Sequence, residues 1–145
     1  LGYFCRANIR QKLYENERIS SLEATKNKEF QLKLPDVLET KEDSYKFDVQ
    51  MIVRDYDKVI ELSPDFSFAY FNKANIFCTL KEFQAAIFNY TRSIEIDPDL
   101  AEAYFNRGLT YLFIGEDAKG LADLSKSGEL GIYKAYNLIQ RFKKQ

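Results

Sequence analysis

Apolar residues recur at intervals of three and four in the middle of this chain. Tyr70, Ala74 and Phe77 follow this spacing, which places their side chains on one face of a helix spanning residues 67–80. A second helix is predicted for residues 82–96. Ala74 and Ala86 are small, so we expect the two helix backbones to cross at these residues. The pattern therefore predicts two short helices joined by a tight turn.

The same pattern occurs again further along the chain. Residues 56–72 shifted by 34 positions fall on residues 90–106, and nine of the seventeen positions are identical. The identical pairs are Tyr56/Tyr90, Ile60/Ile94, Glu61/Glu95, Pro64/Pro98, Asp65/Asp99, Ala69/Ala103, Tyr70/Tyr104, Phe71/Phe105 and Asn72/Asn106. A fixed period of this length is typical of repeat architectures.

The residues of this repeat match a known pattern of aromatic, small and proline positions. Tyr70-x2-Lys73-Ala74-x2-Phe77, then Ala86-x3-Tyr90 and Pro98, resembles the tetratricopeptide repeat (TPR), and Tyr104-x2-Arg107-Gly108-x2-Tyr111 opens another copy. The resemblance covers roughly 110 of the 145 residues. It implies an all-α fold, an α-α superhelix (TPR solenoid) of three helical hairpins plus a C-terminal capping helix, in a single domain of residues 1–145.

The first repeat is interrupted. A shift of 67 positions brings residues 1–13 onto residues 68–80 with six identities, so residues 1–13 are predicted to be its first helix. Its second helix is predicted for residues 47–62, within a segment that runs to residue 66. Pro64 stops that helix, since proline disfavours helix in the residue before it. Residues 14–46 are then an insertion between the two helices.

Two interpretations of the insertion stay open. Its apolar residues are sparse and its charged residues many, which favours a charged loop. Phe30, Leu32 and Leu34 alternate with polar residues, and they could instead anchor an arm that contacts a partner. Pro35 rules out a continuous helix through it.

The chain continues with a regular and an irregular repeat. Residues 67–100 form the second repeat and residues 101–132 the third, in which Gly120 takes the place of the alanine and Leu124 that of the aromatic residue. Gly131 is predicted to follow the end of the third repeat's second helix. Residues 133–145 are predicted to be a capping helix, whose inward residues are Ala135, Tyr136, Ile139 and Phe142.

Composition argues against catalysis. The chain has no histidine, no glycine-rich phosphate loop and no G-x-S-x-G motif, so we expect neither enzymatic activity nor a cofactor or metal. Its formal net charge is −1, with no basic stripe for nucleic acid. Cys5 and Cys78 lie out of step on neighbouring helices, which argues against a disulfide.

No apolar run approaches the roughly 18 residues that a membrane span needs. The chain begins at Leu1 without a methionine, so we expect a fragment of a longer protein. A soluble, cytoplasmic location is the default expectation, because any targeting signal would lie outside the fragment.

The candidate site is a surface. The resemblance implies that first helices line a concave groove, and asparagines at the Asn72 and Asn106 positions often hold a peptide backbone in such proteins. An amide side chain both donates and accepts hydrogen bonds, and neighbouring aromatic rings supply apolar pockets. The predicted peptide-binding residues are Phe4, Asn8, Phe71, Asn72, Asn75, Phe105 and Asn106. The alternative is that the phenylalanines pack between helices and the asparagines are only solvated.

One TPR subclass can be examined directly. TPR modules that grip the C-terminal carboxylate of chaperones use lysine, arginine and asparagine at fixed positions on three first helices. The matching residues here are Phe4, Asn8, Asn72, Glu102 and Asn106, so the cations are missing. Starting one repeat later gives Phe71, Asn75, Asn106, Lys134 and Leu138, which also departs from the pattern. We therefore do not expect this carboxylate clamp.

Two hypotheses for function follow. The first is a non-enzymatic protein–protein interaction module that binds an extended peptide or a partner helix in the concave groove. The second is a structural segment of a longer TPR solenoid, or a scaffold that self-associates through its N-terminal helix, without its own peptide ligand. The identity of the protein partner does not follow from the residues.

Overall fold

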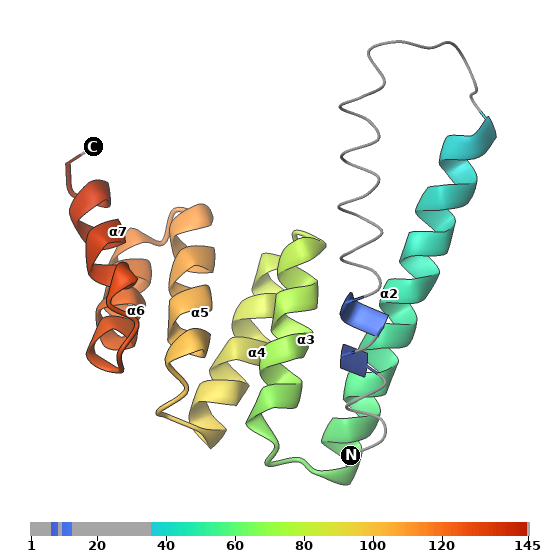
Figure 1. Ribbon diagram of the computed structural model, residues 1–145, viewed down its shortest axis with the longest axis horizontal. Helices are drawn as coiled ribbons and strands as arrows, with labels where there is room; N and C mark the ends of the chain where they lie inside the picture. Colours follow the sequence, from blue (N-terminus) through green and yellow to red (C-terminus); the bar gives the residue numbers. More distant parts are fainter. Residues whose placement is uncertain (1–6, 9, 13–35, 145) are drawn as a thin grey trace. The chain divides into compact units, whose positions relative to one another are not determined.

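The computed structural model describes residues 7, 8, 10–12 and 36–144. Within residues 36–144, side chains are described from residue 48 onward. The described residues form helices and connecting turns, and no strand occurs among them. The fold is all-α, as predicted (Figure 1). Its named helices are α2 (Asp36–Leu62), α3 (Ser67–Thr79), α4 (Phe83–Ile96), α5 (Ala101–Phe113), α6 (Asp117–Glu129) and α7 (Lys134–Phe142).

The chain divides into two compact units, residues 1–59 and 60–145. In the first unit, Val49, Ile52, Tyr56 and Val59 of α2 are buried at helical spacing. The Tyr56 hydroxyl lies 2.6 Å from Asn8 Oδ1 and 2.7 Å from Gln11 Oε1. Arg10 and Asp55 form an ion pair, in which Arg10 Nη1 lies 2.5 Å from Asp55 Oδ2. These contacts hold the helical residues 7, 8 and 10–12 against α2.

Helix α2 is longer than the sequence predicted. It begins at Asp36, whereas residues 47–62 were expected to be helical and residues 14–46 to be an insertion. The predicted start was wrong because nothing local ends the helix there. Residues 36–46 contain no glycine or proline, and Pro35 is the first residue that would interrupt a helix extended toward the N-terminus. The repeat pattern shows where positions equivalent to those of the next repeat begin. It does not show where the helix itself begins.

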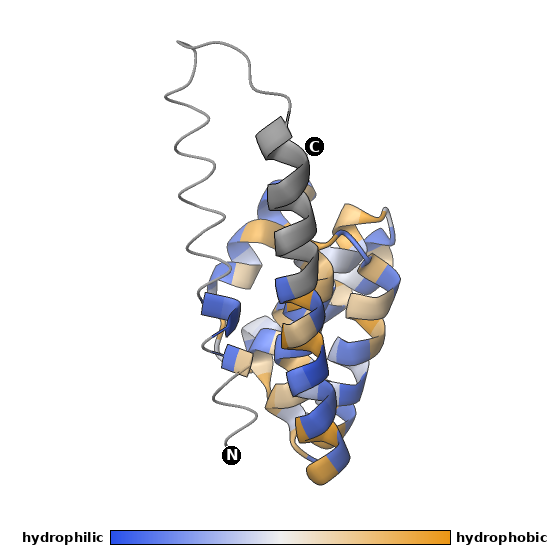
Figure 2. Ribbon diagram, turned by 90° about the vertical axis from the view of Figure 1, so that its right-hand side faces the viewer, coloured by the Kyte–Doolittle hydropathy of each residue, from blue (hydrophilic) through white to orange (hydrophobic). Residues whose placement is uncertain are grey.

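In residues 60–145, each helix packs on the next one in sequence, and α3 also contacts α5 (Figure 1). Ala74 and Ala86 are fully buried together with Tyr90 where α3 and α4 cross, as their small size predicted. A second cluster of Ile94, Leu100 and Ala103 joins consecutive repeats. Figure 2 shows short hydrophobic and hydrophilic bands alternating along the helices, the pattern of amphipathic helices.

The third repeat replaces both crossing alanines by glycine. A Cβ on Gly108 would lie 3.0 Å from the carbonyl oxygen of Gly120, and one on Gly120 would lie 2.9 Å from that of Gly108. Helices α5 and α6 therefore cross in backbone contact. Beyond the crossing, α6 ends at Glu129 and Gly131 follows with a φ of 110°, which confirms the predicted helix end.

Helix α7 matches the expected terminal helix, with Ala135 fully buried. Ile139 and Phe142 are half-buried. Tyr136 was predicted to face inward but is 41 % exposed. Its ring lies so close to Gly128 that a Cβ there would meet it at 2.7 Å, so Tyr136 lies flat against α6 with one side in solvent.

Candidate functional site

Helices α3 and α5 share a solvent-facing stripe that we call the first-helix face. Three of its apolar members are exposed: Phe68 is 45 % exposed, Leu109 39 % and Phe113 72 %. Half-buried amides lie between them at helical spacing. The first-helix face comprises Phe68, Asn72, Asn75 and Thr79 on α3, and Glu102, Phe105, Asn106, Leu109 and Phe113 on α5.

The two phenylalanines predicted to bind peptide in this part of the chain have different surroundings. Phe71 packs against both core clusters, and its ring centroid lies 5.9 Å from that of Tyr90. Phe105 is half-buried beneath the ammonium of Lys134, which lies 4.6 Å from the ring centroid. Phe71 thus serves the core, while Phe105 forms a cation–π pair with the first residue of α7.

Two of the predicted asparagines meet although they are 31 residues apart. Asn106 Nδ2 donates to Asn75 Oδ1 at 2.9 Å, and the Tyr90 hydroxyl donates to the same oxygen at 2.6 Å. Burial, with a contribution from Cys78, raises the pKa of Tyr90 well above its ordinary value. Its hydroxyl is therefore a neutral donor at neutral pH.

The other predicted residues are placed as follows. Asn72 is half-buried on α3, at the position equivalent to Asn106 on α5. Asn8 belongs to residues 1–59, where it contacts Tyr56. Phe4 lies outside the described residues, as do Cys5 and the proposed anchors of the insertion, Phe30, Leu32 and Leu34.

Residue-level reasoning missed a buried ion pair next to this face. Arg107 Nε lies 2.7 Å from Asp123 Oδ2, and Arg107 Nη2 lies 2.8 Å from Oδ1. Arg107 Nη1 donates to Thr91 Oγ1 at 3.0 Å, so one guanidinium joins α4, α5 and α6. Burial alone would lower the pKa of Arg107, but the hydrogen bonds and charge of Asp123 raise it. The local signal was an arginine at a position where the preceding repeat has Lys73.

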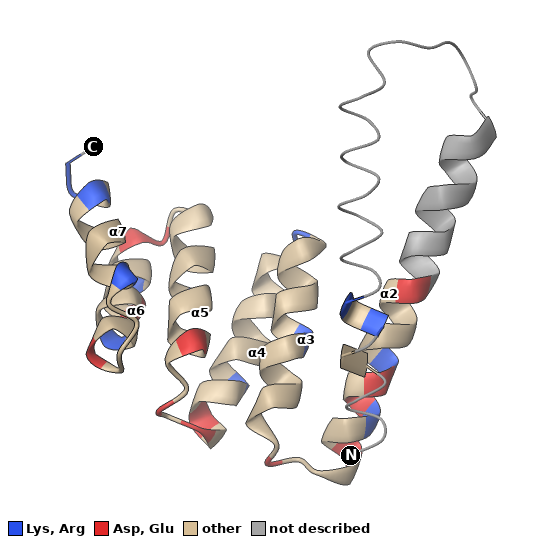
Figure 3. Cartoon of the chain, in the orientation of Figure 1, with Lys and Arg blue, Asp and Glu red and all other residues tan. Residues whose placement is uncertain are grey.

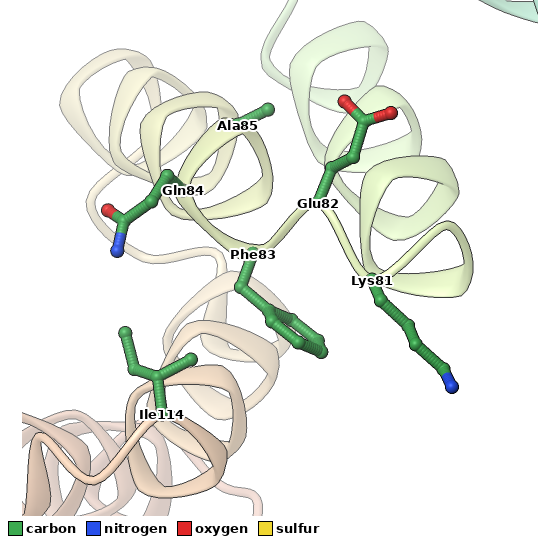
Figure 4. Close-up of a pocket in the computed structure, with 6 residues that line it drawn as sticks. All are labelled: Lys81, Glu82, Phe83, Gln84, Ala85 and Ile114. Carbon is green, nitrogen blue, oxygen red and sulfur yellow. The ribbon is translucent and has the colours of Figure 1, made fainter.

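A shallow pocket of about 460 Å³ lies between the α3–α4 turn and the end of α5. In Figure 4 the side chain of Phe83 points away from that of Glu82, toward the side on which Ile114 lies. The Phe83 ring is 4.8 Å from the exposed ring of Phe113, centroid to centroid. No periodic signal marks this pocket, because its residues come from the α3–α4 turn, the start of α4 and the end of α5, which belong to two different repeats.

The charged side chains of the described residues form neither a patch of one sign nor a group of metal ligands. Figure 3 shows basic and acidic residues interspersed over the helices. In the part of the chain that the structure describes, no group of three His, Cys, Asp or Glu side chains could hold a metal ion. Within the same residues, no helix is long and apolar enough to cross a membrane.

Comparisons with known proteins agree with the helical repeat. Residues 74–115 match a family model described as TPR repeat, and residues 55–88 match one described as tetratricopeptide repeat. No curated protein matches the chain at the sequence level.

Solved structures resemble this fold over most of its length. One is the first TPR of Spaghetti (RPAP3) bound to the HSP90 peptide SRMEEVD, at 20 % identity and a TM-score of 0.62, covering 74 % of this chain and 89 % of that one. Another is the TPR2B domain of yeast Sti1 in a complex with pHsp70, at 25 % identity and a TM-score of 0.62, covering 74 % of this chain and 93 % of that one. With its 34-residue period and its stacked helical hairpins, this chain is a tetratricopeptide repeat protein.

Proposed function

We propose that this chain is a non-enzymatic protein-interaction module that holds an extended peptide on its first-helix face. The observation that carries the proposal is the accessibility of Phe68, Leu109 and Phe113 on that face. The solvent-facing side of an ordinary surface helix is polar, and clustered exposed apolar side chains are typical of interaction sites. Peptide side chains would be received by these three residues.

The asparagines supply the polar half of the site. Asn72 and Asn106 occupy equivalent positions on consecutive first helices, which lie on the order of 10 Å apart. An extended peptide rises about 3.3 Å per residue, so the two amides would meet peptide groups roughly three residues apart. Each amide can donate to a peptide carbonyl and accept from a peptide N–H.

The ligand differs in chemistry from the acidic chaperone peptide in the similar structure. Glu102 and Asn106 occupy positions where carboxylate-gripping TPR modules carry cations, and Glu102 is exposed on the same face. Lys134 is already paired with the Phe105 ring. A terminal carboxylate would meet repulsion from Glu102, so the proposed ligand is an internal peptide segment with apolar side chains.

The double variant Asn72→Ala/Asn106→Ala tests this proposal. A peptide selected from an immobilised array should bind it roughly ten- to a hundredfold more weakly, because two hydrogen bonds of about 1 kcal/mol each are lost. Affinity is measured by titration calorimetry well below the melting temperature. Asn106 also loses its bond to Asn75, so a modest decrease in stability is expected as well.

Gln140→Ala provides the matched control, because Gln140 is an exposed amide of α7 outside the first-helix face. It should bind the same peptide as the unmodified chain does. Unchanged affinity in the double variant, or no peptide selected by the unmodified chain, would contradict the proposal. The hypothesis of a solenoid segment without its own peptide would then be preferred.

A further inference from the structure

The hydroxyl of Tyr90 lies at the centre of the polar contacts beneath the first-helix face. Tyr90 is only 1 % exposed, so it cannot itself touch a ligand on that face. Its hydroxyl donates to Asn75 Oδ1, which also accepts from Asn106 Nδ2. We propose that Tyr90 is a positioning residue that holds the Asn75–Asn106 amide pair in one orientation for a peptide group. This inference rests on the proposed peptide-binding function.

The tyrosine–asparagine pair recurs within the chain. In the first repeat Tyr56 takes the place of Tyr90 and Asn8 that of Asn75, and their side chains form the same bond, also at 2.6 Å. The third repeat has Leu124 at the tyrosine position and Leu109 at the asparagine position. Both members are polar where the tyrosine is present, and both are leucine where it is absent.

This paired change has a physical reason. A buried hydroxyl without a partner is costly, so each tyrosine at this position requires an acceptor on the adjacent first helix. Leu124 is fully buried and has no hydroxyl to satisfy, which leaves residue 109 free to be apolar. Asn75 therefore supplies the acceptor that the Tyr90 hydroxyl needs. Because the same oxygen accepts from Asn106 Nδ2, the orientation of Asn75 also fixes that of Asn106.

The constraint leaves a defined set of atoms for a ligand. Asn75 Oδ1 already accepts two hydrogen bonds, the capacity of a carbonyl oxygen. Within the described residues, Asn106 Oδ1 and Asn75 Nδ2 form no hydrogen bond with another protein atom. Because every buried side-chain N or O atom in that part of the chain has a hydrogen-bond partner, both atoms reach solvent. One acceptor and one donor match the N–H and C=O of a peptide unit.

Orientation before binding matters because a free amide side chain loses rotamer freedom when a ligand fixes it. In Tyr90→Phe the ring remains and only the hydroxyl is removed, so Asn75 and Asn106 can turn. Affinity for the array-selected peptide should fall roughly two- to tenfold. In the ligand-free protein, the side-chain NH₂ signals of Asn106 in a ¹H–¹⁵N spectrum should shift.

Two further variants separate positioning from simple stability. Tyr70→Phe removes the hydroxyl of a half-buried tyrosine outside these contacts and should change neither readout. Tyr90→Leu/Asn75→Leu copies the third repeat, and it should recover melting temperature relative to Tyr90→Phe while affinity remains reduced. Recovery of affinity along with stability would overturn the positioning role.

The two readouts distinguish failure of this inference from failure of the proposed function. If the unmodified chain binds array peptides and Tyr90→Phe binds them equally well, Tyr90 has no positioning role and the proposed function stands. If the unmodified chain binds no peptide, the proposed function fails, and this inference fails with it as a binding device. Unmoved Asn106 signals in Tyr90→Phe would overturn the positioning role in either case.

Discussion

Replacing Asp123 by alanine is expected to lower the free energy of unfolding by about 3 kcal/mol, because it leaves the guanidinium of Arg107 buried without its carboxylate. The two side chains are only 15 % and 11 % exposed, and the pair is bidentate. Arg107 also bonds Thr91, so the loss affects contacts among α4, α5 and α6. Urea unfolding followed by circular dichroism measures the change.

Two comparisons test the cause of this loss. Glu129→Ala breaks an exposed pair with Lys126, in which the charged groups lie 3.6 Å apart, and should cost less than about 1 kcal/mol. Arg107→Met/Asp123→Leu removes both charges and should recover most of the stability lost in Asp123→Ala. If Asp123→Ala were as stable as the unmodified protein, the buried pair would contribute nothing to stability.

Gly120→Ala is expected to destabilise the protein by about 2 kcal/mol, even though alanine is the better helix former. The added Cβ would lie 2.7 Å from the side chain of Leu112 and 2.9 Å from the carbonyl oxygen of Gly108. The second contact is with backbone, so α5 and α6 would have to move apart. Thermal unfolding and urea unfolding both report the change.

Ala122→Gly is the matched control in the same helix. Ala122 is exposed on α6, and its replacement should cost about 1 kcal/mol through helix propensity alone. Glycine would then be worse than alanine at residue 122 and better at residue 120. If alanine were more stabilising than glycine at residue 120 as well as at residue 122, the crossing would have room for a methyl group.

The repeat period predicted most of the helical order. Helices α3 and α4 fall within one or two residues of the predicted bounds, because their turns are marked by Pro64 and Pro98. Residues 74 and 86 were recognised as crossing points from their small size alone. These features depend on neighbours within one helical turn or one hairpin, so a single repeat carries enough information.

The start of α2 and the ion pair of Arg107 could not be predicted in the same way. The comparison of repeats assigned residues 36–46 to an insertion, although their own composition allows helix. Arg107 and Asp123 are sixteen residues apart on different helices, and although Arg107 stands in the repeat motif, nothing in the motif links it to Asp123. Their pairing depends on how α5 and α6 are rotated about their axes.

By itself, the sequence determined an all-α chain of hairpins with a 34-residue period and small residues at the helix crossings, because spacing, proline and side-chain size act locally. Tertiary structure alone decided which contacts the equivalent residues of different repeats make. Phe71 packs into the core while Phe105 lies under Lys134. Asn75 is engaged by Tyr90 and Asn106, which are 15 and 31 residues away. Which atoms of an amide remain for a ligand depends on such distant partners, and these meet only when the helices have packed.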